Sequence, residues 1–271
     1  MSIREMRVAC IGAGMMGGAL MRAVAKVVGG GNLTVSEPNA AKADEFAKEN
    51  GCKAVTSNSE AVKAADVVFL AVKPNVIQQV VQEVASVLSG KIVVSMAAGV
   101  KLATIKEKAG CSKDDSIQWV RIMPNLPAVV GEGMVGLCGT TGTTPEALGK
   151  VQSLLAAAGR VEIVEEKLMD AVTAISGSGP AYCFMFIEAL ADAAVKLGMS
   201  RQQAYVYAAQ TLRGAATMQL ETGRHPGDLK DGVCSPAGTT IAAVEALEQG
   251  GFRGAVMAAA TAAYKRSVEL G

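Results

Sequence analysis

Short continuous apolar runs alternate with segments of helical periodicity through the first half of the chain. The apolar runs cover residues 7–11, 32–36, 67–72, 91–96 and 116–123. Runs of this length are typical of parallel strands that helices cover on both faces. Between them, apolar positions return every three or four residues, as in residues 18–28 and 77–88. This order predicts an α/β fold with a doubly wound sheet.

The strand pattern stops at about residue 168, and the rest of the chain is rich in Ala, Met and Leu at helical spacing. The helices that we expect there cover residues 168–197, 201–222, 236–249 and 253–269. We therefore predict two domains, an α/β domain of residues 1–165 and an all-helical C-terminal domain of residues 166–271.

The predicted helices of the second domain are too apolar for every face to be covered within about 100 residues. Small side chains at several positions would allow helices of two subunits to approach closely. They are Ala208, Ala209, Ala215, Ala216, Ala258, Ala259 and Ala260. A tightly packed monomeric core is the alternative. We expect instead that these helices form a dimerisation domain, in a homodimer.

A glycine-rich turn follows the first predicted strand and opens the first predicted helix. It reads Gly12-Ala13-Gly14-Met15-Met16-Gly17, a complete GxGxxG motif. The first glycine permits a tight turn, the second lets the backbone approach a pyrophosphate, and the third lets the helix pack closely. A second strand follows the helix, so the motif has the context that it requires. The pattern predicts that residues 1–165 form a Rossmann-type domain that binds a dinucleotide.

Small residues end two other predicted strands. Ala71-Val72-Lys73-Pro74 ends one of them, and Ala97-Ala98-Gly99 follows another. In a doubly wound sheet, ligands collect at the carboxyl ends of the strands. We therefore expect both segments to line the cofactor crevice. Lys73 is the one charged residue among them, and it either contacts the cofactor or remains solvated.

The residues after the second strand bear on the choice between NAD and NADP. Glu37 lies where an acid usually holds the ribose hydroxyls of NAD and would repel a 2′-phosphate. Ser36, Asn39 and Asn58 are neutral donors that tolerate a phosphate, but no arginine is close by. Glu37 as a solvated turn residue is a further alternative. From these residues alone, both cofactors remain open.

The segment Ser235-Pro236-Ala237-Gly238-Thr239-Thr240 has the pattern of a helix start. Ser is a favoured N-cap and Pro a favoured first helical residue, so we expect a helix from Pro236. The N–H groups of Gly238, Thr239 and Thr240 would then point outward at the positive end of a helix dipole, where a carboxylate is stabilised. The threonine hydroxyls add groups that donate or accept. An ordinary capped helix is the alternative.

Composition narrows the classes of partner. The chain has 271 residues, of which 50% are hydrophobic and 19% charged, with a formal net charge of +1. This charge provides no field for nucleic acid, and no basic run suggests it. The longest apolar region is interrupted by Glu188, Asp192 and Lys196, so we expect no membrane span. The first strand leads directly into the glycine turn without the apolar stretch of a signal peptide.

Six cysteines are scattered without any CxxC pair. This suits a reducing cytosol, so we expect a cytoplasmic protein without a structural metal. Cys234 lies beside the predicted anion site, but no histidine or second cysteine accompanies it, and a spectator thiol is expected. The only histidine, His225, lies in a polar His-Pro-Gly turn, which disfavours a Ser/His/Asp mechanism.

Taken together, motifs along nearly the whole chain resemble those of the pyrroline-5-carboxylate reductases. They are Gly12-Ala13-Gly14-Met15-Met16-Gly17, Ala71-Val72-Lys73-Pro74, Ala97-Ala98-Gly99-Val100, Ile122-Met123-Pro124-Asn125-Leu126-Pro127, Ser176-Gly177-Ser178-Gly179-Pro180-Ala181-Tyr182, His225-Pro226-Gly227, Leu229-Lys230-Asp231 and Cys234-Ser235-Pro236-Ala237-Gly238-Thr239-Thr240. So many motifs in this order are far more specific than a glycine turn. The resemblance implies NAD(P)H-dependent reduction of 1-pyrroline-5-carboxylate to L-proline, the last step of proline biosynthesis, by hydride transfer to the imine carbon.

The resemblance also implies site residues. Those implied to contact the cofactor are Gly12, Gly14, Met15, Met16, Gly17, Ser36, Asn58, Ala71, Val72, Lys73, Pro74, Ala97, Ala98 and Gly99. Ser235, Gly238 and Thr239 are implied to hold the carboxylate of a small cyclic imine, and Thr240 to meet the ring nitrogen as the catalytic residue. NADPH is implied as the preferred cofactor. Glu37 departs from the neutral residue often found there, which leaves NADH as an alternative.

Two rival classes differ in what they require. A 3-hydroxyacid dehydrogenase needs a base for its alcohol substrate, typically a lysine on the first interdomain helix, and residues 176–190 contain no lysine. A nicotinamide-binding regulatory protein would keep the glycine turn but would not need a carboxylate site at Ser235–Thr240. The reductase is therefore the expected function.

Overall fold

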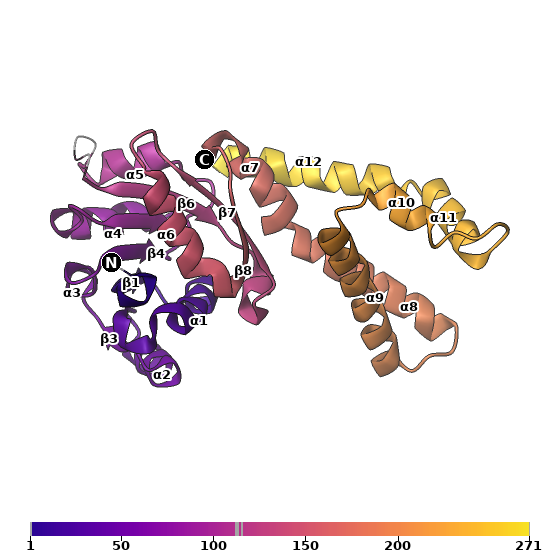
Figure 1. The fold of residues 1–271 in the computed structure, drawn as a ribbon, viewed down its shortest axis with the longest axis horizontal. Coiled ribbons are helices and arrows are strands. Elements are labelled where there is room, and N and C mark those ends of the chain that lie inside the picture. The colour runs from indigo at the N-terminus through magenta and orange to yellow at the C-terminus, as the bar shows by residue number, and fades with distance from the viewer. Residues whose placement is uncertain (1, 112–113, 115, 271) are drawn as a thin grey trace. The chain divides into compact units, whose positions relative to one another are not determined.

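The computed structural model describes residues 2–111, 114 and 116–270 (Figure 1). Its chain divides into two compact units, one made of Met1–Ser178 with Ala263–Gly271 and the other of Gly179–Ala262. Among the described residues, every strand belongs to the first unit, and the second unit is helical.

One sheet of eight strands forms the first unit. The strands are β1 Val8–Ile11, β2 Leu33–Ser36, β3 Lys53–Val55, β4 Val67–Leu70, β5 Ile92–Ser95, β6 Gln118–Met123, β7 Gly133–Gly139 and β8 Gly159–Ile163. Their order is β3-β2-β1-β4-β5-β6-β7-β8, and only the β6–β7 pair is antiparallel among the described strands. The crossover from β3 back to β4 beside β1 is that of a doubly wound sheet. The predicted α/β fold is confirmed, and all five apolar runs form strands.

The helices of this unit connect the strands. They are α1 Met15–Val28, α2 Ala40–Asn50, α3 Asn58–Lys63, α4 Ile77–Val84, α5 Leu102–Lys108, α6 Pro145–Leu155 and α7 Met169–Val172. Short 3-10 turns add η1 Ile3–Glu5, η2 Gly30–Asn32, η3 Ala85–Val87, η4 Leu126–Val130, η5 Ala156–Ala158 and η6 Glu166–Leu168. The π-helical segment η7 Thr173–Gly177 follows α7.

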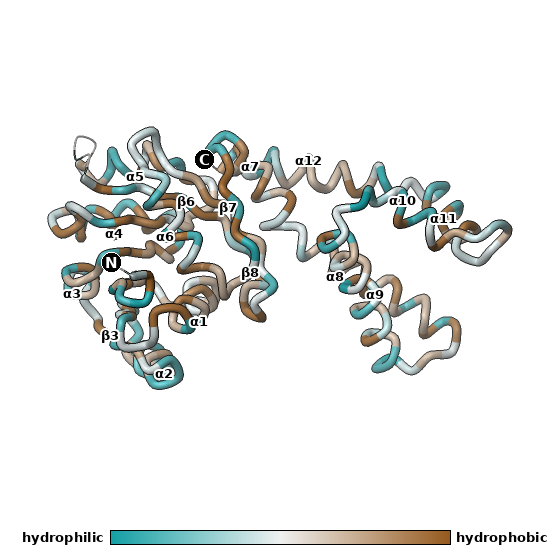
Figure 2. The backbone as a smooth tube through the Cα atoms, viewed as in Figure 1, coloured by the Kyte–Doolittle hydropathy of each residue, from teal (hydrophilic) through white to brown (hydrophobic). Residues whose placement is uncertain are grey.

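Two apolar clusters cover the two faces of the sheet. Val8 and Cys10 of β1 belong to the cluster that contains residues of α1 and α6. Ala9 and Ile11 belong to the cluster that contains residues of α3, α4 and α5. Because successive strand residues point to opposite faces, an uninterrupted apolar strand serves both clusters. Figure 2 shows this pattern as apolar segments within the sheet and a polar outer helix α2.

The second unit consists of helices that bury little of their surface within it. They are α8 Gly179–Lys196, α9 Arg201–Thr222, α10 Pro226–Asp231, α11 Thr239–Gln249 and most of α12 Phe252–Leu270. Its buried cluster consists of Ala191, Ala204 and Ala208, where α8 and α9 pack together. Large apolar side chains on these two helices remain exposed, namely Phe184, Met185, Val206, Tyr207 and Met218.

Three details of the helical part differ from the sequence predictions. The helix expected over residues 168–197 is divided into α7, η7 and α8. The loop that contains His225 holds a further short helix, α10, whose first N–H groups include that of Gly227, which donates to His225 Nδ1 at 3.0 Å. The helix expected from Pro236 begins three residues later, at Thr239.

Candidate active site

The glycine turn between β1 and α1 is shaped by close backbone approach. Gly12 has a φ of +95°, and a Cβ there would lie 2.6 Å from the carbonyl oxygen of Ala71. A Cβ on Gly17 would lie 2.8 Å from the Ala71 Cβ, so α1 also packs tightly against the end of β4. By contrast, a Cβ on Gly14 would meet no atom within 4 Å. The turn is therefore closed on its inner side and open at Gly14, as a pyrophosphate cradle requires.

The start of α1 presents the donors that such a cradle needs. Gly14 is its N-cap, Met15 is 77% exposed and Met16 is half-buried. The N–H groups of the first helical turn have no acceptor within the helix and point along the positive end of its dipole. A pyrophosphate at this position would be bound by backbone N–H groups without any basic side chain.

Three neighbouring strands bring the predicted cofactor residues to one edge of the sheet. β1, β4 and β5 are adjacent and parallel, and their carboxyl ends lead into the glycine turn, Ala71–Pro74 and Ala97–Gly99. The Ala71 N–H donates to the Ile11 carbonyl at 2.9 Å, which extends the ladder to the turn. Lys73 and Pro74 are exposed, whereas Ala97 and Gly99 are buried. The structure thus brings these segments together as the sequence predicted.

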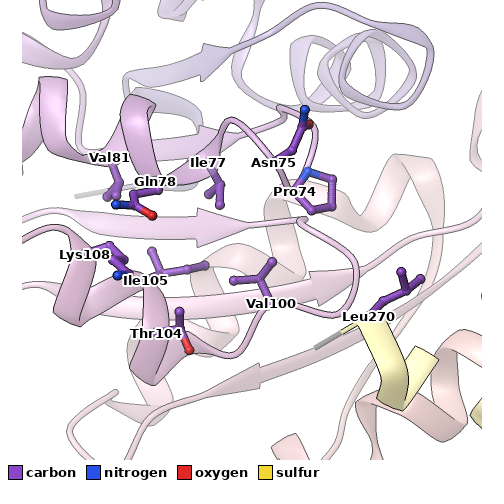
Figure 3. A pocket seen from close by; sticks show the side chains of 10 residues that line it. All are labelled: Pro74, Asn75, Ile77, Gln78, Val81, Val100, Thr104, Ile105, Lys108 and Leu270. Atoms are coloured by element: carbon purple, nitrogen blue, oxygen red, sulfur yellow. The ribbon is translucent and has the colours of Figure 1, made fainter. Parts of the chain in front are cut away.

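A cavity of about 290 Å³ lies between α4 and α5 and borders this edge. Pro74 and Val100 lie at the end where the two small-residue segments finish, and Ile77, Val81 and Ile105 form its apolar lining (Figure 3). Its lining also includes Gln78, Thr104, Lys108 and, from the end of α12, Leu270.

The end of β2 carries the residues expected near the adenosine ribose. Ser36 is buried, and its Oγ donates to Asn58 Oδ1 at 2.7 Å. Asn58 Nδ2 in turn donates to Glu83 Oε2 at 2.8 Å. The Glu37 carboxylate accepts the Ala13 N–H at 3.0 Å and the Asn39 N–H at 3.3 Å. Glu37 is therefore attached to the glycine turn itself and is not a freely solvated turn residue.

Glu83 was not predicted from the sequence as part of this group. It lies on α4, 25 residues beyond Asn58, in a segment whose periodicity indicates only an amphipathic helix. Its contact with Asn58 arises because α3 packs beside α4. A sequence pattern within one helix does not reveal such packing.

The segment before α11 belongs to the second unit and corrects one prediction. The Gly238 N–H donates to the Ser235 carbonyl at 3.0 Å, and Ala237 has a φ of 56°. Pro236 and Ala237 therefore occupy the centre of a tight turn, because a residue with positive φ cannot continue a helix. Helix α11 begins at Thr239 with Gly238, not Ser235, as its N-cap. The predicted helix start at Pro236 is wrong.

The turn changes which backbone groups could meet a ligand. The Gly238 N–H is used within the turn, whereas the N–H groups of Thr239 and Thr240 belong to the first turn of α11 and have no helical acceptor. A Cβ on Gly238 would overlap Ser235 Oγ, so the Ser235 hydroxyl lies close to the helix start. Ser235 and Thr239 are exposed and Thr240 is half-buried.

A buried arginine of the sheet lies close to the partly exposed carboxylate of Glu166. Arg121 of β6 is 4% exposed, and its Nη1 lies 3.7 Å from Glu166 Oε1. The same oxygen accepts the Leu102 N–H at 2.9 Å, at the start of α5. This contact holds α5 directly after the Ala97–Gly99 segment.

Two cysteines of the first unit, Cys10 and Cys138, are buried. Burial raises the pKa of the Cys10 thiol above its ordinary range, and it raises the pKa of Cys138 to about 11. Both thiols therefore stay protonated near neutral pH. All six cysteines are free. Among the described residues, no group of three His, Cys, Asp or Glu side chains is arranged to hold a metal ion. In the same part of the chain, no helix is long and apolar enough to cross a membrane.

Family models match both parts of the chain. The model described as pyrroline-5-carboxylate reductase dimerisation matches residues 166–270, and the model described as NADP oxidoreductase, coenzyme F420-dependent, matches residues 7–99. Two solved structures are similar over the whole chain. The pyrroline-5-carboxylate reductase of Coxiella burnetii has a TM-score of 0.91 at 34% identity and covers 98% of both chains. The Plasmodium falciparum pyrroline carboxylate reductase with NADP bound has a TM-score of 0.88 at 31% identity and covers 100% of both chains.

Sequence relatives agree with this result. The pyrroline-5-carboxylate reductase of Arabidopsis thaliana is 45% identical and covers 97% of this chain and 95% of the relative. The pyrroline-5-carboxylate reductase of Escherichia coli K12 is 42% identical over 98% of both chains. The resemblance seen in the motifs is confirmed, and the chain belongs to the pyrroline-5-carboxylate reductase family.

Proposed function

We propose that this protein reduces 1-pyrroline-5-carboxylate to L-proline with NAD(P)H, as the last step of proline biosynthesis. The observation that carries the proposal is family membership over almost the full length, at 45% identity to a named reductase. The glycine turn that is closed at Gly12 and open at Gly14 supports the cofactor half of the proposal.

In this proposal the cofactor occupies the carboxyl edge of β1, β4 and β5. Its pyrophosphate is bound by the N–H groups at the start of α1, with Met15 and Met16 beside it. Its nicotinamide half lies along Ala71–Pro74 and Ala97–Gly99, whose small residues leave room for a flat ring. When bound, the reduced nicotinamide supplies the hydride.

The substrate half of the proposal uses the start of α11. The substrate is a small ring with one carboxylate and one imine. Ser235, Gly238 and Thr239 hold the carboxylate, with the Thr239 N–H and the Ser235 hydroxyl as the donors that fit the observed turn. The Thr240 hydroxyl meets the ring nitrogen and orients the imine carbon.

The chemistry needs positioning more than a strong acid. One hydride is added to the imine carbon, and the nitrogen, protonated before or during transfer, keeps its proton in the amine product. The Thr240 hydroxyl can hydrogen-bond to this nitrogen in either state, because a hydroxyl both donates and accepts. Orientation and electrostatics then supply most of the rate.

For the cofactor we propose a preference for NADPH, with NADH also accepted. Ser36 and Asn58 are the neutral partners proposed for the adenosine 2′-phosphate, and a structure of a family member has NADP bound. The Glu37 carboxylate opposes this preference by its charge, although two backbone N–H groups already share that charge.

For the assembly we propose a homodimer or a dimer-based larger oligomer. The dimerisation model matches residues 166–270, which supports a division into a cofactor domain of residues 1–165 and a helical domain of residues 166–271. The exposed apolar side chains of α8 and α9 support burial by a second subunit. The unpaired, scattered cysteines suit the cytoplasm as the proposed location.

The test follows the absorbance of NADPH, and separately of NADH, after pyrroline-5-carboxylate is added to the purified full-length protein. We expect rapid oxidation of both cofactors, faster with NADPH, and proline as the product. Cofactor binding without oxidation would favour the rival function of a nicotinamide-binding regulatory protein. Light scattering of the same sample tests the assembly, and a monomer mass at all concentrations would contradict it.

A further inference from the structure

Three polar side chains form a connected chain from β2 to α4. Ser36 Oγ donates to Asn58 Oδ1 at 2.7 Å, and Asn58 Nδ2 donates to Glu83 Oε2 at 2.8 Å. Ser36 is buried, Asn58 half-buried and Glu83 exposed. A second contact ties the same part of α4 to α3, because Ser59 Oγ donates to the Glu83 carbonyl at 3.3 Å. Two hydrogen bonds, one to the Glu83 carboxylate and one to its backbone carbonyl, therefore hold Glu83 beside α3.

The residues at the two ends of this hydrogen-bonded series, Ser36 and Glu83, differ in how far they restrict the orientation of the Asn58 amide. A serine hydroxyl both donates and accepts, so Ser36 can pair with either the oxygen or the nitrogen of the Asn58 amide. An ionised carboxylate only accepts, so Glu83 can pair with the nitrogen alone. A flipped amide would place Asn58 Oδ1 against a carboxylate oxygen, which is repulsive. Glu83, and not Ser36, therefore determines which way the amide points.

The orientation matters because Nδ2 is the only donor atom of the amide. One N–H of Asn58 Nδ2 is donated to Glu83, and the amide keeps a second N–H for a ligand. Asn58 lies beside the carboxyl end of β2, where a doubly wound sheet receives the adenosine ribose. A 2′-phosphate accepts hydrogen bonds and would be repelled by an exposed amide oxygen.

We propose that Glu83 is a positioning residue for cofactor selection, which holds the Asn58 amide in the orientation that offers an N–H to the 2′-phosphate of NADPH. This inference rests on the proposed nucleotide site and goes beyond the reductase reaction. Glu83 also brings a negative charge, which by itself would weaken phosphate binding. Orientation and charge therefore predict opposite effects of removing it.

The experiment titrates the full-length protein with adenosine 2′,5′-bisphosphate and with adenosine 5′-monophosphate by calorimetry. If Glu83 orients Asn58, Glu83→Ala weakens binding of the bisphosphate about fivefold relative to the monophosphate, the size of one lost hydrogen bond. Glu83→Gln can pair with either atom of the Asn58 amide, because its own amide both donates and accepts, so it should lose the selectivity as well. In steady-state assays, the Ala variant should raise KM for NADPH and leave kcat unchanged.

Glu60→Ala is the matched control. Glu60 lies on α3, two residues from Asn58, and pairs with Lys53 at 2.8 Å without contacting the amide. The substitution removes a carboxylate from the helix that carries Asn58 without removing the hydrogen bond between Asn58 and Glu83, so it should leave the selectivity unchanged. Equal melting temperatures of all three variants would show that the fold is retained.

Several results would overturn the proposal. They are an unchanged selectivity in Glu83→Ala, tighter bisphosphate binding in that variant, full selectivity in Glu83→Gln, and no binding of either nucleotide by the unaltered protein. The titration needs no substrate turnover. A protein that binds the nucleotides but reduces no imine would refute the proposed reaction and still decide the role of Glu83.

Discussion

The turn before α1 and the turn before α11 both present backbone N–H groups at the start of a helix, yet they are held by different means. The first is enclosed by neighbouring strands, and α1 buries Leu20, Met21 and Val24 in the core. The second is closed by its own hydrogen bond from Gly238 to Ser235. No residue of α11, all of which the structure describes, is buried.

The difference between the two turns indicates how far a single subunit determines the structure of each. Core packing determines the backbone of the glycine turn, so its conformation is set within a single subunit. The turn at Ser235–Gly238 lies in a unit whose large apolar side chains remain exposed. The comparison therefore supports the proposed oligomer, in which a second subunit would cover these side chains.

The largest expected effect comes from Gly12→Ala. The substitution forces a Cβ into the Ala71 carbonyl at a φ of +95°. We expect the free energy of unfolding to fall by about 3 kcal/mol. Gly14→Ala is the matched variant, because its Cβ meets no atom within 4 Å. It should keep the melting temperature but weaken nucleotide binding at least about tenfold, since the cradle is filled. Equal stability of the two variants in denaturant titrations would contradict the enclosed turn.

Thr240→Ala tests the second turn. Loss of one hydroxyl beside the ring nitrogen should lower kcat about tenfold and leave the Kd for NADPH unchanged. Thr261→Ala is the control, because the Thr261 hydroxyl donates to the Met257 carbonyl of its own helix at 2.8 Å. Unaltered steady-state kinetics in the Thr240 variant would exclude the proposed role.

Glu37→Gln tests the attachment of the first turn to β2. Glutamine retains an oxygen that can accept the Ala13 N–H but loses the charge that repels a 2′-phosphate. We expect the ratio of kcat/KM for NADPH to that for NADH to rise about fivefold. Glu49→Gln is the control. Glu49 lies on α2 and forms an exposed ion pair with Arg22 of α1, so its replacement should leave the ratio unchanged. An unchanged ratio would show that the Glu37 charge does not act on the cofactor.

The smallest effect is expected from Ala237→Gly. Ala237 is the only described residue other than glycine with a positive φ, at 56°. Glycine relieves the strain of this conformation, so stability should rise by about 0.5 kcal/mol after the entropy cost of glycine is included. Ala243→Gly, in the exposed interior of α11, should instead lose about 1 kcal/mol. A loss in both variants would argue against a strained turn.

The sequence predicts the central strands well, because strands buried on both faces are apolar at every position. β3, β7 and β8 were not predicted. β3 is three residues long with an exposed first residue, and β7 contains three of the chain's glycines, Gly133, Gly136 and Gly139. At Gly133 and Gly136, a Cβ would lie 2.7 Å from atoms of Ala158 and Val172 respectively, so packing between distant segments selects glycine where strand propensity does not.

The site was predictable where it depends on local backbone and less so where it depends on distant partners. The glycine turn follows from one motif. The helix start before α11 was misplaced because Ser-Pro followed by a small residue suits both a helix cap and a tight turn. The contacts of Glu83 with Asn58 and of Glu166 with Leu102 join segments 25 and 64 residues apart, which no single-sequence pattern encodes.

The path of α12 affects which C-terminal deletions the protein tolerates. The helix begins at Phe252 in the second unit, but its residues from Ala263 onward belong to the first. There Ser267 is buried, and its Oγ donates to Asp170 Oδ1 at 2.7 Å. In topological terms the helical unit is an insertion rather than an appendage. A deletion of the last eight or so residues would therefore remove part of the first unit, although these residues follow the helical unit in the sequence.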